Sequence, residues 1–288
     1  MFRNPLLILV LLGLSSISLA QNQDSLTFVH TKWKKKSIGA KSRLITHHFN
    51  TKNLFSANQN ISYIEVKKKR AAEFAIGQEL KVLKPTPAFG IEANAVAAVN
   101  GTFFDVKNGG SVDLIKVDGI VVAENRLEPS GNRAAHQQAA VLIENGKLSV
   151  RKWDGSPTWE LEEKAPNMMV TGPLLSIDQV EANLDSGSFN VTRHPRTAIG
   201  IKPNGRVILL TVDGRNDNSA GMSLFELRNI MKWLGCTTSI NLDGGGSTTL
   251  WVAGEGENGI VNYPTDNKKW DHKGERNVAN TILLKKKR

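Results

Sequence analysis

The residues best suited to chemistry in this sequence are two aspartates, each placed where a predicted strand ends. Asp213 follows the apolar run of residues 207–212, and Asp243 follows the short run of residues 239–242. Paired carboxylates can share general acid and base roles in hydrolysis, or they can hold Ca²⁺ or Mg²⁺. Asp213 also begins an Asp-Gly-Arg sequence that is typical of a simple turn, so both interpretations stay open for it.

The segment between the two strands predicts a helix that would bring these carboxylates together. Ser223 and Glu226 form a capping-box pattern, and apolar residues then recur at helical spacing over residues 224–234 until Gly235. A strand–helix–strand crossover places its two strands parallel in one sheet. Both aspartates would then emerge at the same sheet edge, where ligands usually bind.

A run of three glycines and a serine follows Asp243, namely Gly244, Gly245, Gly246 and Ser247. Glycine loses more conformational freedom than any other residue on folding, so such a run needs a structural reason. Its backbone N–H groups could form a nest for an anion, with the Ser247 hydroxyl as a further donor. A tight turn in a β-structure is the equal alternative. No Gly-Lys-Ser/Thr sequence and no predicted helix follow, which excludes a nucleotide-binding P-loop.

Side chains at other predicted strand ends could complete an anion site. Arg196 lies at the entrance to an apolar strand, and Arg276 precedes the last predicted strand, residues 278–284. A guanidinium group fits a phosphate with two parallel hydrogen bonds. Asn100 ends the apolar run of residues 95–99. Taken singly, each arginine is typical of a surface or salt-bridging residue, and an asparagine before glycine is typical of a turn.

Composition narrows the classes of function. The chain has 288 residues, a net charge of +10 and 40% hydrophobic residues, which predicts a sizeable core and a surface that attracts anions. The single cysteine, Cys236, excludes an intramolecular disulfide, and no Cys or His pairs have zinc-finger or iron–sulfur spacing. No run interleaves aromatic residues with Arg or Lys, so nucleic acid is not expected as a partner.

The first 20 residues have the pattern of a signal peptide. A basic start is followed by the apolar run of residues 5–14 and by Ser18 and Ala20, at the positions where a signal peptidase requires small residues. We expect cleavage after Ala20 and therefore an exported protein, periplasmic or secreted. A membrane span needs about 20 apolar residues, so no integral membrane segment is expected after cleavage.

The rest of the chain predicts an α+β fold with a mixed β-sheet core and few helices. Residues 21–70 alternate apolar and polar positions, and residues 21–88 are interpreted as a β-rich N-terminal lead-in. Residues 89–288 would form the catalytic domain. In it, one strand–helix–strand unit carries the site at the C-terminal ends of its strands.

Seven motifs in order along the chain are more specific than any single residue. They are Val-Asn-Gly-Thr-Phe-Phe from residue 99, Thr-Gly-Pro-Leu-Leu from 171, Pro-Arg-Thr-Ala-Ile-Gly from 195, Thr-Val-Asp-Gly-Arg from 211, Gly-Met-Ser-Leu-Phe-Glu-Leu from 221, Asn-Leu-Asp-Gly-Gly-Gly-Ser-Thr-Thr from 241 and Glu-Arg-Asn-Val-Ala-Asn from 275. Over residues 90–284 the chain therefore resembles the phosphodiester glycosidase family. That family includes the animal uncovering enzyme, which removes N-acetylglucosamine from mannose 6-phosphate on lysosomal hydrolases, and exported bacterial proteins.

The resemblance implies hydrolysis of the bond between the anomeric carbon of a sugar and a phosphate oxygen, in a phosphorylated or phosphate-linked glycan. Because phosphate is a good leaving group, stabilising its charge matters more than a strong general acid. The resemblance implies Asp213, Asp243 and Glu275 as catalytic residues. The residues that it implies for substrate binding are Asn100, Arg196, Arg215, Gly244, Gly245, Gly246, Ser247 and Arg276. Arg196 and Arg276 would hold the phosphate while the two aspartates face the sugar.

Two alternatives from other classes stay open at this point. One is a non-catalytic surface module that binds anionic glycan, and the other is a metal-dependent phosphodiesterase that cuts a phosphorus–oxygen bond. No cofactor is expected and no residue is assigned to a metal, although the paired carboxylates could hold Ca²⁺ or Mg²⁺. The identity of the sugar and the oligomeric state stay open.

Overall fold

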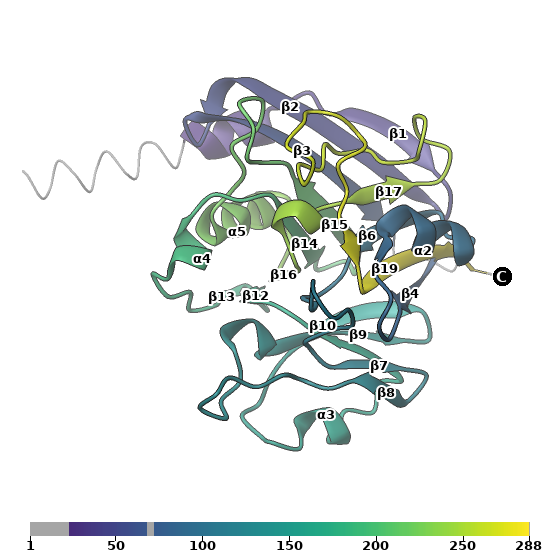
Figure 1. Cartoon of the computed structure of the whole chain (residues 1–288). Helices are drawn as coiled ribbons and strands as arrows, with labels where there is room; N and C mark the ends of the chain where they lie inside the picture. Colours follow the sequence, from purple (N-terminus) through teal and green to yellow (C-terminus); the bar gives the residue numbers. More distant parts are fainter. Residues whose placement is uncertain (1–22, 68–71, 288) are drawn as a thin grey trace, which may run out of the picture.

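The computed structural model describes residues 23–67 and 72–287. Within them the chain builds one large antiparallel sheet and smaller sheets beside it, with the helices toward the periphery (Figure 1). The predicted signal peptide, residues 1–20, lies outside the described residues. In the described part of the chain, no helix is long and apolar enough to cross a membrane.

The large sheet has eight strands, and every neighbouring pair in it is antiparallel. In spatial order they are β1 (Lys34–Ile38), β2 (Ser42–Leu54), β3 (Ala57–Val66), β15 (Val207–Val212), β14 (Arg196–Ile201), β16 (Thr238–Asn241), β12 (Leu174–Ile177) and β13 (Val180–Glu181). Strands β2 and β3 carry apolar residues on both faces, Leu44 and Ile64 on one and Ile45 and Ile61 on the other.

Two smaller sheets pack against the large one. A five-stranded sheet contains β10 (Lys147–Lys152), β9 (Ala139–Glu144), β11 (Asn167–Val170), β7 (Ile115–Val117) and β8 (Ile120–Ala123). A four-stranded sheet contains β17 (Leu250–Val252), β6 (Ala97–Asn100), β19 (Asn280–Lys286) and β4 (Ala72–Gln78), and the short strands β18 (Asn277–Val278) and β5 (Lys84–Pro85) pair with each other. These sheets supply the opposite wall of the core.

The helices are short except for one. They are residues 23–29, α2 (Thr86–Glu92), α3 (Trp159–Glu162), α4 (Ser188–Val191) and α5 (Leu224–Trp233), with single 3₁₀ turns at Ala135–Gln137 and Gly245–Ser247. The start predicted for α5 is confirmed: the Ser223 hydroxyl accepts from the Glu226 N–H and the Glu226 carboxylate accepts from the Ser223 N–H. Gly235 follows the helix with φ +82°, the left-handed conformation that glycine adopts without strain.

Apolar side chains fill both faces of the large sheet. On one face, Leu209 and Ile240 pack with residues of the smaller sheets such as Val141 and Ile282. On the other face, the apolar stripe of α5 packs on residues such as Leu210. The sheet is therefore buried on both sides near its centre, which fixes the relative positions of β14, β15 and β16.

The strand–helix–strand unit runs from β15 through α5 to β16. β14 lies between these two strands and is antiparallel to both, so β15 and β16 are parallel to each other but are not neighbours. The predicted parallel arrangement is confirmed, and the intervening strand is an addition that the sequence did not predict. Because β14 runs the opposite way, its first residue lies at the same edge as the last residues of β15 and β16.

The lead-in of residues 21–88 is not separate from the rest of the fold. β3 pairs with β15 from Ile61 opposite Val212 to Val66 opposite Val207, and β4 pairs with β19 along its whole length. The division expected at residue 88 is therefore not a boundary between structural units. Backbone pairing between segments about 150 residues apart is invisible to local sequence patterns. The α+β class itself is confirmed.

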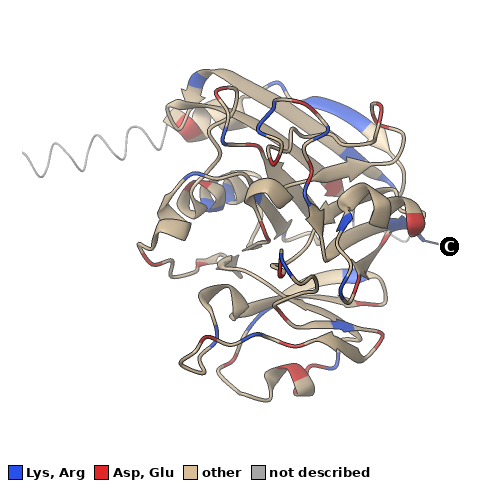
Figure 2. Cartoon of the chain, in the orientation of Figure 1, with Lys and Arg blue, Asp and Glu red and all other residues tan. Residues whose placement is uncertain are grey.

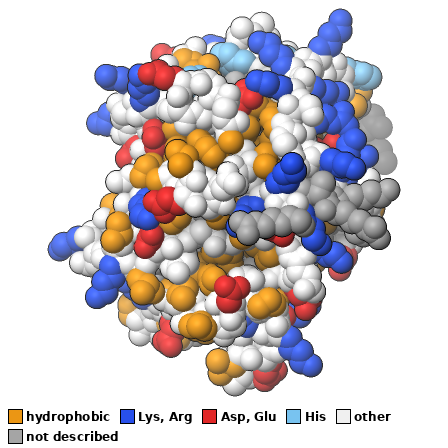
Figure 3. Space-filling model, turned by 90° about the vertical axis from the view of Figure 1, so that its right-hand side faces the viewer, with side chains coloured by type: hydrophobic (Ala, Val, Ile, Leu, Met, Phe, Trp, Pro, Cys, Tyr) orange, Lys and Arg blue, Asp and Glu red, His pale blue; other side chains and the backbone are white. Residues whose placement is uncertain are grey.

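Charged residues lie mainly on the outer surface of the fold. β1 is an exposed edge strand with three consecutive lysines, and Figure 2 shows Lys and Arg along it. Lysines on an edge strand discourage pairing with other chains. On the face shown in Figure 3, hydrophobic side chains gather across the middle while Lys and Arg lie mostly toward the edges.

Removing the cap of α5 should weaken the whole fold, because this helix covers the large sheet. Ser223→Ala removes the hydroxyl that accepts from the Glu226 N–H. We expect the free energy of unfolding to fall by about 1 kcal/mol, measured by urea denaturation. Ser223→Thr retains a hydroxyl, and Ser186→Ala changes an exposed serine outside the helix, so both should stay close to the wild type. Equal stability of Ser223→Ala and Ser186→Ala would contradict the role of the cap.

Candidate active site

One edge of the large sheet collects the residues that the sequence singled out. Arg196 is the first residue of β14 and pairs with Val212, the residue before Asp213. Asp243 lies two residues beyond the end of β16, and its N–H donates to the Gly101 carbonyl just after β6. The ends of β15 and β16 meet at this edge, as the crossover predicted. The start of β14 and the end of β6 lie there as well.

The glycine run forms a loop that lies in close contact with Pro195, Arg215 and Arg276. A Cβ at Gly244 would lie 2.6 Å from the Pro195 carbonyl oxygen, and Gly245 has φ +61°. A Cβ at Gly246 would lie 2.8 Å from Arg276 Nη2. Three glycines are required here because larger residues would displace the segments above them.

Two backbone amides of this loop are not available for the expected anion nest. The Gly244 N–H donates to Asp243 Oδ1 at 2.8 Å, and the Gly245 N–H donates to the Pro195 carbonyl at 2.9 Å. Both groups are already used within the protein. The loop instead fixes its own path and holds the Asp243 side chain in one orientation.

Two guanidinium groups lie above the loop, one over each of two consecutive glycines. Arg215 Nη2 would be 3.1 Å from a Cβ at Gly245, and Arg276 Nη2 would be 2.8 Å from a Cβ at Gly246. Arg215 is exposed and has φ +60°, a conformation that L residues seldom adopt and that is concentrated at functional sites. The Asp266 carboxylate, which pairs with Arg276, also lies over Gly246, so Arg215 is the guanidinium of the two without a carboxylate partner among the described residues.

Neighbouring side chains position these two guanidinium groups. Arg276 donates to Asp266 Oδ1 through Nε at 3.1 Å and Nη2 at 2.5 Å, and this hydrogen bonding raises its pKa. Arg215 Nη2 lies 3.4 Å from His194 Nδ1. Burial lowers the pKa of His194, and the charges of Arg196 and Arg215 lower it further. His194 therefore contributes a neutral ring beside the guanidinium groups.

Asp243 combines partial exposure with a strongly perturbed environment. Burial raises its pKa to about 6, while the Ser247 hydroxyl, the Gly244 N–H and the charge of Arg276 act in the opposite direction. The Ser247 hydroxyl has no hydrogen bond of good geometry in the described structure, although it lies close enough to lower this pKa. A carboxyl group that ionises near neutral pH beside an arginine is suited to catalysis.

A second acidic residue, which the sequence did not indicate, lies near Asp243. Asp113 is fully buried, and its charge raises the pKa of Asp243. Its carboxylate accepts from the Thr102 hydroxyl at 2.6 Å and from Gln137 Nε2 at 2.8 Å, and it lies 3.0 Å from His136 Nε2. This is the arrangement in which a carboxylate orients a histidine for proton transfer.

His136 also belongs to an aromatic wall next to this carboxylate. Its ring centroid lies 4.4 Å from that of Phe103, which in turn lies 6.1 Å from that of Phe189 on α4. The His136 side chain is 26% exposed and Phe189 is 42% exposed, so both reach the surface. Only the fold assembles this wall, because its residues come from three distant segments with no motif in common.

Three of the predicted site residues lie behind this surface rather than on it. Asn100 is fully buried and joins four segments: it accepts from the Thr197 hydroxyl and the Thr249 N–H and donates to the Asp243 carbonyl. Arg196 is 1% exposed and donates to the carbonyls of Met222, Phe189 and Thr192. Burial lowers the pKa of Arg196 to about 10. Both side chains hold backbone in place.

Asp213 is the third of these residues. It is 1% exposed, and its carboxylate accepts from Asn60 Nδ2 at 2.7 Å, Asn262 Nδ2 at 2.8 Å and the Tyr263 N–H at 3.0 Å. Burial raises its pKa to about 6 despite these bonds. Both oxygens of the Asp213 carboxylate accept hydrogen bonds from protein groups, so this carboxylate does not face a ligand.

Unpartnered polar atoms mark the surroundings of the glycine loop. Glu275 Oε2 is buried without a hydrogen-bond partner among the described residues, and the same holds for the hydroxyls of Ser247, Thr248 and Thr249. Buried polar groups are normally paired, so such a group in a native structure calls for a ligand or water. In the same described part, no group of three or more His, Cys, Asp or Glu residues is arranged to hold a metal ion.

The comparison with known families decides the identity of this domain. A family model described as phosphodiester glycosidase matches residues 93–285, which is well over half of the chain. The chain belongs to the phosphodiester glycosidase family. The family expected from the seven motifs is thereby confirmed.

Relatives of this phosphodiester glycosidase family member occur in bacteria and animals. The chain is 30% identical over 171 residues to an SPbeta prophage-derived uncharacterized protein, YomE, of Bacillus subtilis, covering 58% of this chain and 26% of that one. It is 25% identical over 189 residues to the mouse N-acetylglucosamine-1-phosphodiester alpha-N-acetylglucosaminidase, covering 61% and 34%. The chain thus spans about a quarter to a third of the length of these relatives.

Solved structures share the fold of this phosphodiester glycosidase domain. The catalytic domain of the zebrafish N-acetylglucosamine-1-phosphodiester alpha-N-acetylglucosaminidase superposes with a TM-score of 0.64 at 19% identity and covers 88% of both chains. A hypothetical protein from Synechocystis superposes with a TM-score of 0.64 at 14% identity, covering 88% of this chain and 64% of that one. At these identities the likeness concerns the fold alone.

The raised pKa of Asp243 predicts how stability depends on pH. In the folded state its pKa is about 6, and in the unfolded chain it is about 4. Between these values the folded protein binds the additional proton, so the contribution of Asp243 to stability is fully present below about pH 4 and is lost as the pH rises through about 6. The Asp243→Asn variant lacks this loss.

The measurement is urea unfolding of the two proteins between pH 4 and pH 7. The stability of the wild type relative to Asp243→Asn should decrease over this interval. Asp217→Asn, which changes an exposed aspartate, should run parallel to the wild type. A constant difference between the wild type and Asp243→Asn at every pH would contradict the raised pKa.

Proposed function

We propose that this protein hydrolyses sugar 1-phosphodiesters at the bond between the anomeric carbon and the phosphate oxygen. The observation that carries the proposal is the loop that follows β16, where the charge of Arg276 acts on Asp243 and the Arg215 guanidinium lies over Gly245. An anion and a neighbouring electrophilic carbon would be held together there. The family model and the names of the animal relatives support the same reaction.

In this proposal the phosphate lies on Arg215 and Arg276, while the Ser247 hydroxyl, which is fully buried, lies close to the Asp243 carboxylate. Both arginines remain charged at neutral pH, and each presents several N–H donors in one plane. As the anomeric C–O bond breaks, the bonding electron pair leaves with the phosphate, and the guanidinium groups stabilise the charge that develops. Arg215 has one neighbour in His194, so its remaining donors are available to a ligand.

Asp243 faces the sugar in this arrangement. Asp243 is partly exposed, and the positive charge of Arg276 is close enough to lower its pKa. With a pKa of about 6 it is ionised at neutral pH and stabilises the positive charge that develops at the anomeric carbon. Asp213, whose carboxylate is enclosed by three donors, acts by holding the loops in place.

The Asp113–His136 pair handles the proton of the attacking water. The buried carboxylate of Asp113 holds His136 Nε2 at 3.0 Å, which leaves the other ring nitrogen for a second partner. Water forms the new bond to the anomeric carbon and gives its proton to this imidazole. Phe103 packs against this ring, Phe189 packs against Phe103, and together they limit the access of bulk water.

The natural substrate that we propose is a phosphate-linked glycan outside the cytoplasm, such as a cell-wall or capsular polymer. Two features support this choice. The N-terminus has the pattern of a signal peptide, and the chain carries a net charge of +10, which attracts polyanionic glycans.

The bond that is cleaved can be identified with isotopic water. The purified protein is incubated in ¹⁸O-water with the methyl diester of N-acetylglucosamine 1-phosphate, and the methyl phosphate is analysed by mass spectrometry. Cleavage at the anomeric carbon gives methyl phosphate without label, because the water oxygen enters the sugar. Asp243→Asn should lower kcat by about a thousandfold, whereas Asp217→Asn should have no effect.

Label in the phosphate product would overturn the proposal in favour of a phosphodiesterase. Saturable binding of the diester without any turnover would instead indicate a non-catalytic glycan-binding module. Both outcomes are read from the same incubation, supplemented by calorimetry.

Replacing His136 tests the proton-transfer step separately. His136→Gln retains a group that can donate to Asp113 but cannot accept a proton from water. We expect kcat to fall by about a hundredfold with little change in KM. His30→Gln, at an exposed position, is the control. An unchanged kcat would remove His136 from the mechanism.

A further inference from the structure

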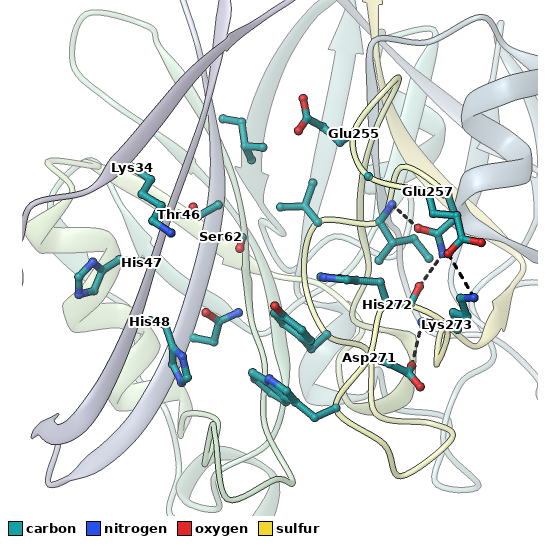
Figure 4. A pocket seen from close by; sticks show the side chains of 18 residues that line it. Lys34, Thr46, His47, His48, Ser62, Glu255, Glu257, Asp271, His272 and Lys273 are labelled. Carbon is teal, nitrogen blue, oxygen red and sulfur yellow. Dashed lines mark hydrogen bonds and ion pairs between the residues drawn. The ribbon is translucent and has the colours of Figure 1, made fainter.

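A groove of about 860 Å³ lies between strands β2 and β3 and the loop of residues 255–273 (Figure 4). Arg215, Asp243 and Arg276 are not among the residues that line it. Its volume falls within the range of ligand pockets, roughly 300–1,000 Å³. The proposed hydrolysis uses none of its exposed side chains.

The strand side of the groove is polar where the same sheet face is elsewhere apolar. Leu44 and Ile64, which are opposite each other on β2 and β3, belong to the core. Along the same face, the next cross-strand pairs are Thr46 with Ser62 and His48 with Asn60. Thr46, His48 and Ser62 lie on this side of the cavity in Figure 4. The face therefore changes from core to a strip of hydrogen-bonding groups.

The loop side of the groove is aromatic. The rings of Tyr263 and Trp270 are stacked with centroids 4.2 Å apart and planes at 0°, and His272 lies 4.2 Å from Tyr263. His48 reaches across from β2 to within 5.9 Å of Trp270. Flat aromatic rings thus face hydroxyl and amide groups across the cavity, and Figure 4 shows His272 on this loop side.

Charges around the groove are largely neutralised by one another. Glu255 pairs with Lys36 at 2.6 Å, and Glu257 pairs with Lys273 at 3.2 Å. Two lysines and three carboxylates line the groove, in a chain whose net charge is +10. Unlike the guanidinium groups over the glycine loop, this surface has no excess of positive charge to attract an anion.

We propose that this groove binds a neutral saccharide chain. A sugar ring presents C–H groups on its faces and hydroxyls around its rim. The first fit the aromatic stack, and the second fit the polar strip. The proposal goes beyond the hydrolysis at Asp243 and holds whether or not that reaction takes place.

Two residues connect the groove to the site edge. Asn60 and Tyr263 both line the groove, and both donate to the carboxylate of Asp213. A glycan held in the groove is therefore tethered to the same rigid part of the molecule as Asp243. Such tethering raises the local concentration of the remaining parts of the chain near the site edge.

The test is direct binding of chitotetraose, maltotetraose and cellotetraose to the full-length protein by calorimetry at millimolar concentrations. At least one of these neutral probes should bind, and Trp270→Ala should raise its dissociation constant about tenfold. His48→Ala, on the opposite wall, should weaken binding as well, whereas His30→Ala should not. Hydrolysis of the small methyl diester should be unchanged in Trp270→Ala, which separates this proposal from that of the active site.

Three results would overturn the proposal. The first is that no neutral probe binds. The second is that the probes bind with equal affinity to the wild type, Trp270→Ala and His48→Ala. The third is that an anionic oligogalacturonate binds in a Trp270-dependent manner while the neutral probes do not, which would assign the groove to acidic glycans. Circular dichroism and urea unfolding of both variants show whether the fold is retained, and His48→Ala keeps the test valid if Trp270→Ala does not fold.

Discussion

The carboxylate of Asp213 joins strand β3 to the loop that follows β17. It accepts hydrogen bonds from Asn60 on β3 and from Asn262 and Tyr263 in the C-terminal loop, while its own backbone continues β15. Burying a carboxylate is costly, and the raised pKa shows that three donors do not fully offset the loss of water. The protein accepts this cost where one side chain fixes three segments at once.

The polar residues at the sheet edge are thus of two kinds: some are buried and hold loops in place, and others lie nearer the surface. Asn100, Arg196 and Asp213 are buried and satisfied by backbone and amide groups, so they hold the loops in place. Asp243, Arg215 and Arg276 lie in front of them with donors or acceptors that are not fully used. A site of this kind is preorganised: the supporting layer is satisfied, and the reactive layer retains unmet hydrogen-bonding capacity.

The molecule has two surfaces of different chemistry. Guanidinium groups over the glycine loop suit a phosphate, whereas the groove beside β2 and β3 pairs its charges internally and exposes aromatic rings. These surfaces share Asn60 and Tyr263 through Asp213, so they are rigidly related. A polymer with both neutral sugars and phosphodiester links would meet each of its parts with a suitable surface.

The sequence by itself determined the features that depend on neighbouring residues. The cap and apolar stripe of α5, the strands that end at Asp213 and Asp243, and the family motifs are local, and they correctly predicted one shared edge. Only the tertiary structure decided which carboxylate is enclosed and which is accessible, and it alone brought His136 to Asp113. Asp213 and Asn60 are 153 positions apart, and each aspartate is followed by glycine in the sequence. The environment of a side chain is set by such distant partners, and no local pattern records them.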